Sequence, residues 1–125
     1  PISQKIFLAQ FNTITKIAKE GPCVIIGRCA DYALSDFDNC IHIFLYADEK
    51  FKTGYIMDTM KLSERDAKDL CIKTDKQRQS YYNYYTSKKW GRADSSDLCL
   101  TTGTLGIDGS VNMIKQFIEN YEKGK

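Results

Sequence analysis

Three short apolar runs, separated by longer helical patterns, constrain the fold of this chain more than any other feature. The runs occupy residues 22–27, 40–46 and 97–102, and the first two lack the alternation of a half-exposed strand. Continuous short runs of this kind are typical of strands covered on both faces, as in parallel sheets. We therefore expect a strand at each of the three positions.

Helical periodicity fills most of the sequence between these runs. The expected helices cover residues 3–20, 28–34, 48–61 and 63–85, and a closing helix begins near Asp108. Ser3, Ser63 and Asp108 are suitable capping residues, and Gly21 is a suitable stop. The resulting order, α-β-α-β-α-α-β-α, predicts an α/β fold in three layers, with a parallel sheet and flanking helices.

The length and composition exclude several classes of protein. The 125 residues are expected to form one domain, 1–125, and a net charge of +2 is too small to indicate a nucleic-acid partner by itself. No apolar run approaches the roughly 20 residues that a membrane span requires. The five cysteines form no Cys-x-x-Cys pair, and the single histidine, His42, lies in an expected strand. This pattern indicates a cytoplasmic protein with reduced thiols and without a metal site.

One stretch, residues 75–92, combines positive charge with aromatic rings. It contains five cations, Lys76, Arg78, Lys88, Lys89 and Arg92, together with four tyrosines and the only tryptophan. Cationic groups bind phosphate oxygens, and aromatic rings stack on flat bases, so the stretch suits a nucleotide. The alternative interpretation is an amphipathic helix whose tyrosines face the core and whose charges face water.

The predicted strand ends indicate where a ligand would bind. In parallel α/β sheets, ligands bind beyond the carboxyl ends of the strands. Arg28 follows the first expected strand directly, Asp48 lies two residues after the second, and Gly103 follows the third. Arg28 would therefore lie at the functional rim, where it reaches a phosphate; a helix-capping or surface ion-pair role remains open.

Several motifs, in order, resemble one known family. They are Gly-Pro-Cys-Val-Ile-Ile-Gly-Arg-Cys-Ala-Asp-Tyr at 21–32, the strand pattern at 41–47, Asp-Lys-x-Arg-x-x-Tyr-Tyr-x-x-Tyr-Thr at 75–86, Trp-Gly at 90–91, and Asp-Leu-Cys-Leu at 97–100. This series resembles the cytidylate kinase-like proteins, bacterial relatives of nucleoside monophosphate kinases. The resemblance covers nearly the whole chain. It implies a P-loop kinase-like fold, a lid-like segment at about 63–96, and ATP with Mg²⁺ as phosphate donor in the full-length protein.

The resemblance also implies roles for individual residues. Arg28 would bind the acceptor phosphate, and Lys76 and Arg78 would be the catalytic lid cations that stabilise the phosphoryl group in transfer. Cys29 stands where true cytidylate kinases have the aspartate of a Gly-Arg-Asp turn, so Asp31 is a weaker candidate for orienting the acceptor or Arg28. Relatives often carry arginines in the helix after Tyr46, whereas this chain has only Lys52 there.

The phosphate-binding motif of such enzymes is missing from these residues. No Gly-x-x-x-x-Gly-Lys-Ser/Thr sequence occurs, so we expect a C-terminal portion that lacks the N-terminal strands and binds no cofactor by itself. The missing strand would lie between the strands at Val24 and Ile43. This predicts either a gap of about two strand spacings, near 10 Å, or a rearranged pairing.

Three functions remain open at this stage. The first is part of a phosphotransferase that moves the ATP γ-phosphate to a nucleotide or other small acceptor, the fragment itself being inactive. The second is a non-catalytic nucleotide-binding or regulatory module, and the third is a small nucleic-acid-binding domain. If the first function is correct, the partner is a small molecule, no membrane is involved, and the protein could form a homo-oligomer. The first function also predicts that Arg28, Lys76 and Arg78 converge on one cleft, and that residues 86–95 are exposed.

Overall fold

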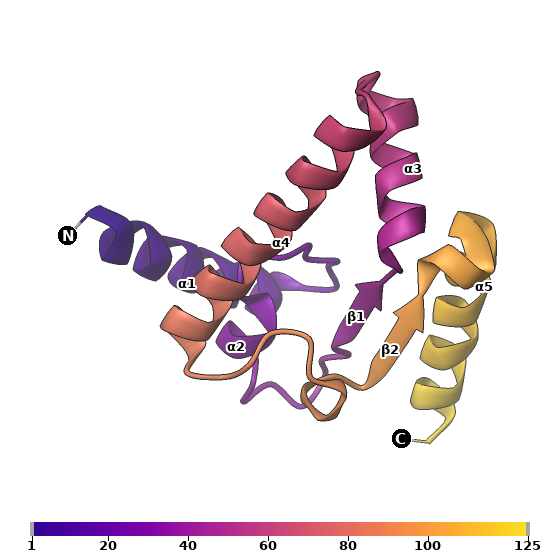
Figure 1. Cartoon of the computed structure of the whole chain (residues 1–125). Helices are drawn as coiled ribbons and strands as arrows, with labels where there is room; N and C mark the ends of the chain where they lie inside the picture. Colours follow the sequence, from indigo (N-terminus) through magenta and orange to yellow (C-terminus); the bar gives the residue numbers. More distant parts are fainter. Residues whose placement is uncertain (1, 125) are drawn as a thin grey trace.

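A computed structural model describes residues 2–124 and consists mainly of helices (Figure 1). In chain order, the elements are helix α1 (Ile2–Glu20), helix α2 (Ala30–Ala33), strand β1 (Ile43–Tyr46), helix α3 (Glu49–Met60), helix α4 (Glu64–Thr86), a 3-10 turn η1 (Ala93–Ser95), strand β2 (Leu98–Thr101) and helix α5 (Thr102–Lys123). Helices α3 and α4 form an antiparallel pair beyond the end of β1, and α5 lies beside β2.

Within residues 2–124, the sheet has two strands. Strands β1 and β2 are parallel, and the register places Ile43 opposite Leu98 and Tyr46 opposite Thr101. The backbone carbonyl of His42 accepts hydrogen bonds from the amides of Asp97 and Leu98, and the His42 amide donates to the Asp97 carboxylate at 2.7 Å. These bonds align the beginnings of the two strands, with His42 taking part through its backbone.

The prediction of a three-layer α/β fold with a P-loop kinase-like sheet is therefore wrong. The apolar run at residues 22–27 forms no strand, and its Val24 and Ile26 side chains are 92% and 88% exposed. A strand requires a neighbouring row of backbone donors and acceptors, and within residues 2–124 β1 is paired only with β2. The strand at Val24, beside which the sequence predicted a two-strand gap or a rearranged pairing, is therefore not formed in the part of the chain that the structure describes.

The helices follow local sequence signals closely. Helix α3 begins where the Asp48 carboxylate accepts a hydrogen bond from the Phe51 amide, and α4 begins where the Ser63 hydroxyl accepts one from the Asp66 amide. Such caps satisfy amide groups that the first helical turn leaves unpaired. Helix α4 is continuous from Glu64 to Thr86. Helix α5 begins at Thr102, before the expected start near Asp108, and has one kink at Gly106, where φ is 73°.

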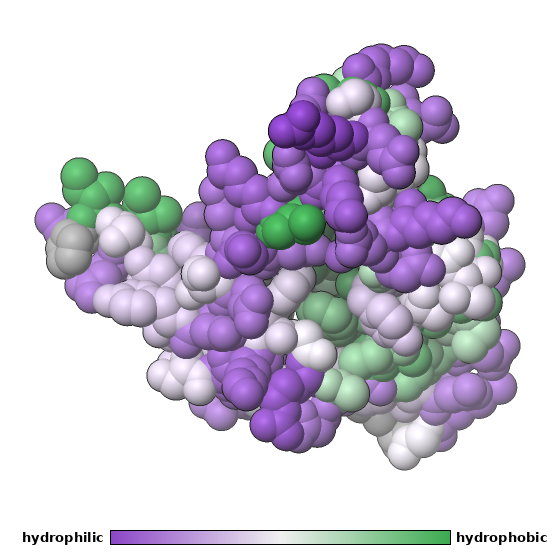
Figure 2. Space-filling view, in the orientation of Figure 1, coloured by the Kyte–Doolittle hydropathy of each residue, from purple (hydrophilic) through white to green (hydrophobic). Residues whose placement is uncertain are grey.

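The main apolar cluster lies between α1 and the segment around α2. Its buried residues are Ile14, Ala33 and Leu34, and further apolar side chains pack against them: Phe11, Ala18, Ile25, Ala30, Phe37 and Cys40. Apolar side chains also gather openly at the beginning of α1 and where the two strands run (Figure 2). No helix within residues 2–124 is long and apolar enough to cross a membrane.

Candidate functional site

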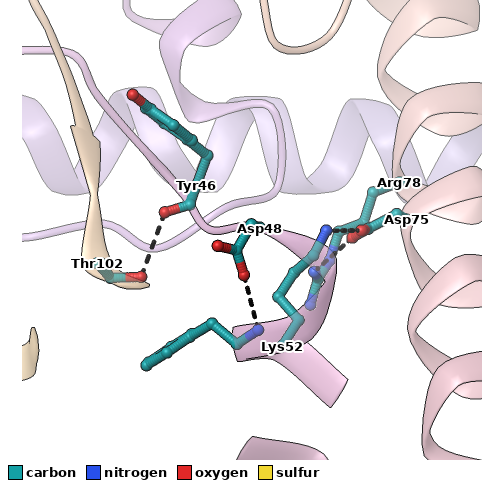
Figure 3. A network of polar contacts seen from close by, with 7 residues as sticks. Tyr46, Asp48, Lys52, Asp75, Arg78 and Thr102 are labelled. Carbon is teal, nitrogen blue, oxygen red and sulfur yellow. Dashed lines mark hydrogen bonds and ion pairs between the residues drawn. The ribbon is translucent and has the colours of Figure 1, made fainter. Parts of the chain in front are cut away.

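A network of charged side chains lies beyond the carboxyl ends of the two strands (Figure 3). The Lys52 ammonium is 2.6 Å from one carboxylate oxygen of Asp75, and the Arg78 guanidinium is 3.4 Å from the other. Close by, the Thr102 hydroxyl donates to the Tyr46 carbonyl at 3.3 Å, which joins the two strand ends. Two cations, Lys52 and Arg78, and two anions, Asp48 and Asp75, thus gather at the sheet edge where the sequence predicts ligand binding.

The path of the chain explains why these residues meet. Helix α3 starts at the Asp48 cap directly after β1, and Lys52 lies one turn into that helix. Helix α4 then runs back along α3, which brings Asp75 against Lys52. The side chains of Asp75, Lys52 and Arg78 are 27%, 38% and 64% exposed, so the network is open to solvent.

Arg78 is the cation of the network that is least engaged by its carboxylate partner. A distance of 3.4 Å is beyond the usual range for a hydrogen bond between nitrogen and oxygen, so Asp75 holds Arg78 only loosely. A guanidinium has five donors in a planar fork that suits phosphate oxygens. The arrangement can therefore accept an anion on Arg78 while Asp75 keeps Lys52 in place.

Arg28 lies in a left-handed turn that packs against the last two turns of α4. Gly27, Arg28 and Cys29 have φ values of 68°, 59° and 55°, and the Ala30 amide donates to the Gly27 carbonyl at 3.1 Å. Left-handed backbone costs about 1–2 kcal/mol for each non-glycine residue. Two such residues in succession indicate a turn that the surrounding structure holds in shape.

The buried thiol of Cys29 belongs to this turn, and a buried tyrosine, Tyr82 of α4, lies beside it. The Tyr82 hydroxyl donates to an Asp31 carboxylate oxygen at 2.7 Å, and the Tyr82 side chain is buried. Burial, together with this bond, raises the pKa of Tyr82. Burial, and to a smaller extent the Asp31 charge, raises the pKa of the Cys29 thiol to about 11, so the thiol is protonated at neutral pH and is no ready nucleophile.

The Arg28 side chain is exposed and lies near Tyr81. Burial raises the pKa of Tyr81, and the positive charge of Arg28 partly offsets that rise. Tyr81 and Tyr82 are neighbours on α4, and Tyr82 lies one turn after Arg78. The turn that carries Arg28 thus contacts α4 about one helical turn after Arg78.

Lys76 lies elsewhere. Residues two apart on an α-helix project about 200° from each other, so Lys76 and Arg78 occupy nearly opposite faces of α4. Lys76 lines an open groove of about 810 Å³ on the outer face of the helix, together with Tyr81 and Tyr84. Lys76 and Arg78, two of the three cations expected to converge, therefore face different sides of α4.

The segment after α4 is mostly exposed, in line with the sequence prediction for residues 86–95. Two residues tie it down: Thr86 is buried, and the Trp90 ring packs edge-on against Phe44 with centroids 5.4 Å apart. The Trp90 amide also donates to the Asn83 side chain at 2.8 Å.

Sequence reasoning missed two residues of the site. Asp75 lies three residues before Arg78 on a predicted helix, a spacing that often pairs opposite charges, so its sequence signal was present. The contact between Tyr82 and Asp31 spans 51 positions, and no local pattern points to it. No group of three or more His, Cys, Asp or Glu within residues 2–124 is arranged to hold a metal ion.

Comparison with known proteins supports the resemblance seen in the sequence. A family model described as the cytidylate kinase-like family matches residues 1–104. A crystal structure of an uncharacterized protein from Eubacterium ventriosum ATCC 27560 superposes with a TM-score of 0.89 at 36% sequence identity, covering 94% of this chain and 67% of that one. No curated protein matches the chain. Since the family match spans well over half of the sequence, the chain belongs to the cytidylate kinase-like family.

Proposed function

We propose that this chain is part of a phosphotransferase that transfers the ATP γ-phosphate, with Mg²⁺, to a nucleotide or another small phosphate acceptor. Membership of the cytidylate kinase-like family supports a kinase-like relationship. The observation that carries the proposal is the solvent-open network of Lys52, Asp75 and Arg78 at the carboxyl ends of β1 and β2. Enzymes of phosphoryl transfer work mainly by positioning such charges around the moving group.

Each cation has a distinct role in this proposal. Arg78 contacts the phosphoryl group, because it is the most exposed member of the network and the most loosely held. Lys52 adds charge at the same strand ends, and Arg28 binds the acceptor phosphate from its left-handed turn. Lys76 faces the outer groove, so we assign it to ligand contacts beside Tyr81 and Tyr84 rather than to charge stabilisation.

The described residues do not themselves fit magnesium or a triphosphate. The Asp48 carboxylate is engaged by the Phe51 amide, and that of Asp75 by two cations. The 125 residues also contain no glycine-rich loop followed by lysine that would cradle a triphosphate. We therefore expect this chain by itself to bind a monophosphate without transferring phosphate.

The first prediction concerns phosphate-dependent binding. In calorimetric titrations of the 125-residue chain, CMP and the other ribonucleoside monophosphates should bind, and cytidine should bind far more weakly. A hydrogen bond to a charged group contributes about 1.5–3 kcal/mol, so Arg78→Gln should weaken monophosphate binding about 10- to 100-fold. Arg65→Gln is the matched control, because Arg65 is an exposed arginine on the same helix, far from the strand ends.

Two results would contradict the proposal. Equal affinity for CMP and cytidine would show that no phosphate is recognised. Equal losses from Arg78→Gln and Arg65→Gln would show that general charge, and not the network, governs binding. Tight micromolar binding of Mg²⁺–ATP to a monomer of these residues would contradict the assignment of the chain to the acceptor side.

A non-catalytic nucleotide-binding module is the second candidate. Both candidates predict monophosphate binding. Only the phosphotransferase predicts that the full-length protein converts ATP and a monophosphate to two diphosphates. Chromatographic separation of radiolabelled products after incubation distinguishes the two candidates.

A further inference from the structure

The turn that carries Arg28 is fixed to α4 by a hydrogen bond that the proposed chemistry leaves unexplained. One Asp31 oxygen accepts from the Tyr82 hydroxyl at 2.7 Å, and the other accepts from the Tyr32 amide at 2.9 Å. Both oxygens of Asp31 are therefore engaged within the protein. This geometry turns Asp31 toward the support of its own turn and away from direct contact with a ligand.

Two neighbours of Arg28 in this region are buried, whereas Arg28 itself is exposed. Cys29 is 7% exposed, and Tyr82 is 8% exposed, whereas Arg28 between the glycine and the buried cysteine is exposed. Cys29 of the turn and Tyr82 of α4 are thus buried, and the guanidinium of Arg28 remains in solvent. Its left-handed backbone requires such support, because isolated chains avoid consecutive non-glycine residues of this conformation.

The anchoring point on α4 is close to Arg78. Tyr82 follows Arg78 by four residues, and residues at this spacing lie on the same face of a helix, one turn apart. Asp75, which contacts Arg78, lies one turn earlier on that face. A bond at Tyr82 therefore sets the position of the Arg28 turn relative to the charged network at the strand ends.

We propose that Tyr82 and Asp31 are positioning residues that hold the Arg28 turn against the Arg78 face of α4, so that both arginines bind the same phosphorylated ligand. This inference rests on the proposed function for the identity of the ligand. The anchoring itself is a property of the free protein and is measurable without any ligand.

The test begins with Tyr82→Phe, which removes the hydroxyl and keeps the ring. Amide hydrogen exchange at Ala30 and Tyr32, whose amides donate within the turn, should become about tenfold faster as the turn is released. Tyr84→Phe is the matched control, because Tyr84 lies two residues further along α4 and is 69% exposed. Asp31→Asn keeps an acceptor oxygen for the tyrosine, so it should restore most of the protection that Asp31→Ala loses. Far-ultraviolet circular dichroism verifies that each variant remains folded.

The second measurement uses CMP as the probe. Tyr82→Phe should lower CMP affinity about tenfold in the wild-type background and have almost no effect in an Arg28→Gln background, because it acts through Arg28. Residues that act through one another show such non-additive effects, whereas a general loss of stability would weaken binding equally in both backgrounds.

The outcomes separate the two proposals. Unchanged exchange at Ala30 and Tyr32 in Tyr82→Phe would overturn the anchoring role, whatever the ligand data show. Faster exchange in Tyr82→Phe, together with a wild-type chain that fails to bind CMP, would support the anchor and contradict the phosphate-binding function. Additive losses from Tyr82→Phe and Arg28→Gln would overturn the positioning role.

Discussion

The first half of α4 and its last two turns are attached to the rest of the molecule by different forces. In the first half, Ala67 and Cys71 are buried, and exposed charges also join α4 to α3: Lys68 with Glu49 at 3.2 Å, and Asp75 with Lys52 at 2.6 Å. Pairs of exposed charges contribute only about 0–1 kcal/mol each, because water already solvates both partners and salt screens them.

In the last two turns, aromatic rings and buried hydroxyls make the attachment. Phe7 of α1 stacks on Tyr85 with ring centroids 4.4 Å apart, and the buried Tyr82 bonds to Asp31. Aromatic pairs add about 0.5–1.5 kcal/mol beyond the apolar area they bury. The aromatic and buried contacts beside Arg28 are therefore stronger than the exposed ion pairs that join α4 to α3. The charged stretch around Arg78 can exchange partners at little cost, which suits a group that must bind and release an anion.

The largest effect should come from removing the aromatic attachment. Phe7 contacts four rings, including those of Tyr85 and Tyr32, so Phe7→Ala should lower the free energy of unfolding by about 2–3 kcal/mol. Urea denaturation followed by circular dichroism measures the change. Leu8→Ala, one residue along α1 at a side chain that is 57% exposed, should cost far less. Equal losses of unfolding free energy in the two variants would contradict a stabilising role for the ring contacts of Phe7.

A smaller loss of stability against unfolding should appear as the pH rises. The pKa of Cys29 rises from 9.0 to about 11 on burial, so the folded state holds the thiol proton more tightly than the unfolded state does. The stability that this difference contributes is complete below pH 9 and is lost as the pH rises toward about 11, because only the unfolded chain ionises readily there.

Unfolding midpoints between pH 8 and 11 measure this dependence. Cys29→Ala should lose stability less steeply over that range than the wild type, and Cys23→Ala, at an exposed thiol, should follow the wild-type slope. Tyr81 and Tyr82, whose pKa values are also raised by burial, remain in both variants, so their contribution cancels in the comparison. Identical slopes for all three proteins would contradict a thiol buried in the Arg28 turn.

The smallest effect should come from the charged attachment. Asp75→Asn leaves Lys52 and Arg78 without an anionic partner, yet both are partly exposed, so we expect a loss of at most about 1 kcal/mol that diminishes with added salt. Urea denaturation in low and high salt measures it. A loss larger than that of Phe7→Ala would reverse the ranking of the two attachments.

The helices could be predicted from the sequence because their signals are local. Asp48 and Ser63 cap α3 and α4 at the expected positions, through bonds to amides three residues away. The sheet could not be predicted in the same way. Val24 and Ile43 both lie in continuous apolar runs, but only the second belongs to a strand, because β2 pairs with it. Composition indicates the environment that a side chain prefers, whereas pairing depends on a partner far along the chain.

The candidate site shows the same division. The placement of Arg28 after an apolar run and of Arg78 on a long helix followed from motifs, and the separation of Lys76 from Arg78 follows from helical geometry alone. The contact between Tyr82 and Asp31 depends on how α4 crosses the turn after α1, and this crossing is set by the packing of rings on Phe7. The spacing of residues along the sequence does not predict such a crossing.

Trp90 gives the protein a natural spectroscopic reporter. It is the only tryptophan in the chain, its amide is bonded to Asn83 near the end of α4, and its ring rests edge-on against Phe44 of β1. Its indole emission is sensitive to solvent, so fluorescence from this single residue reports whether the end of α4 stays seated against the sheet. The contact between the aromatic end of α4 and the strands can thus be followed in solution without an added label.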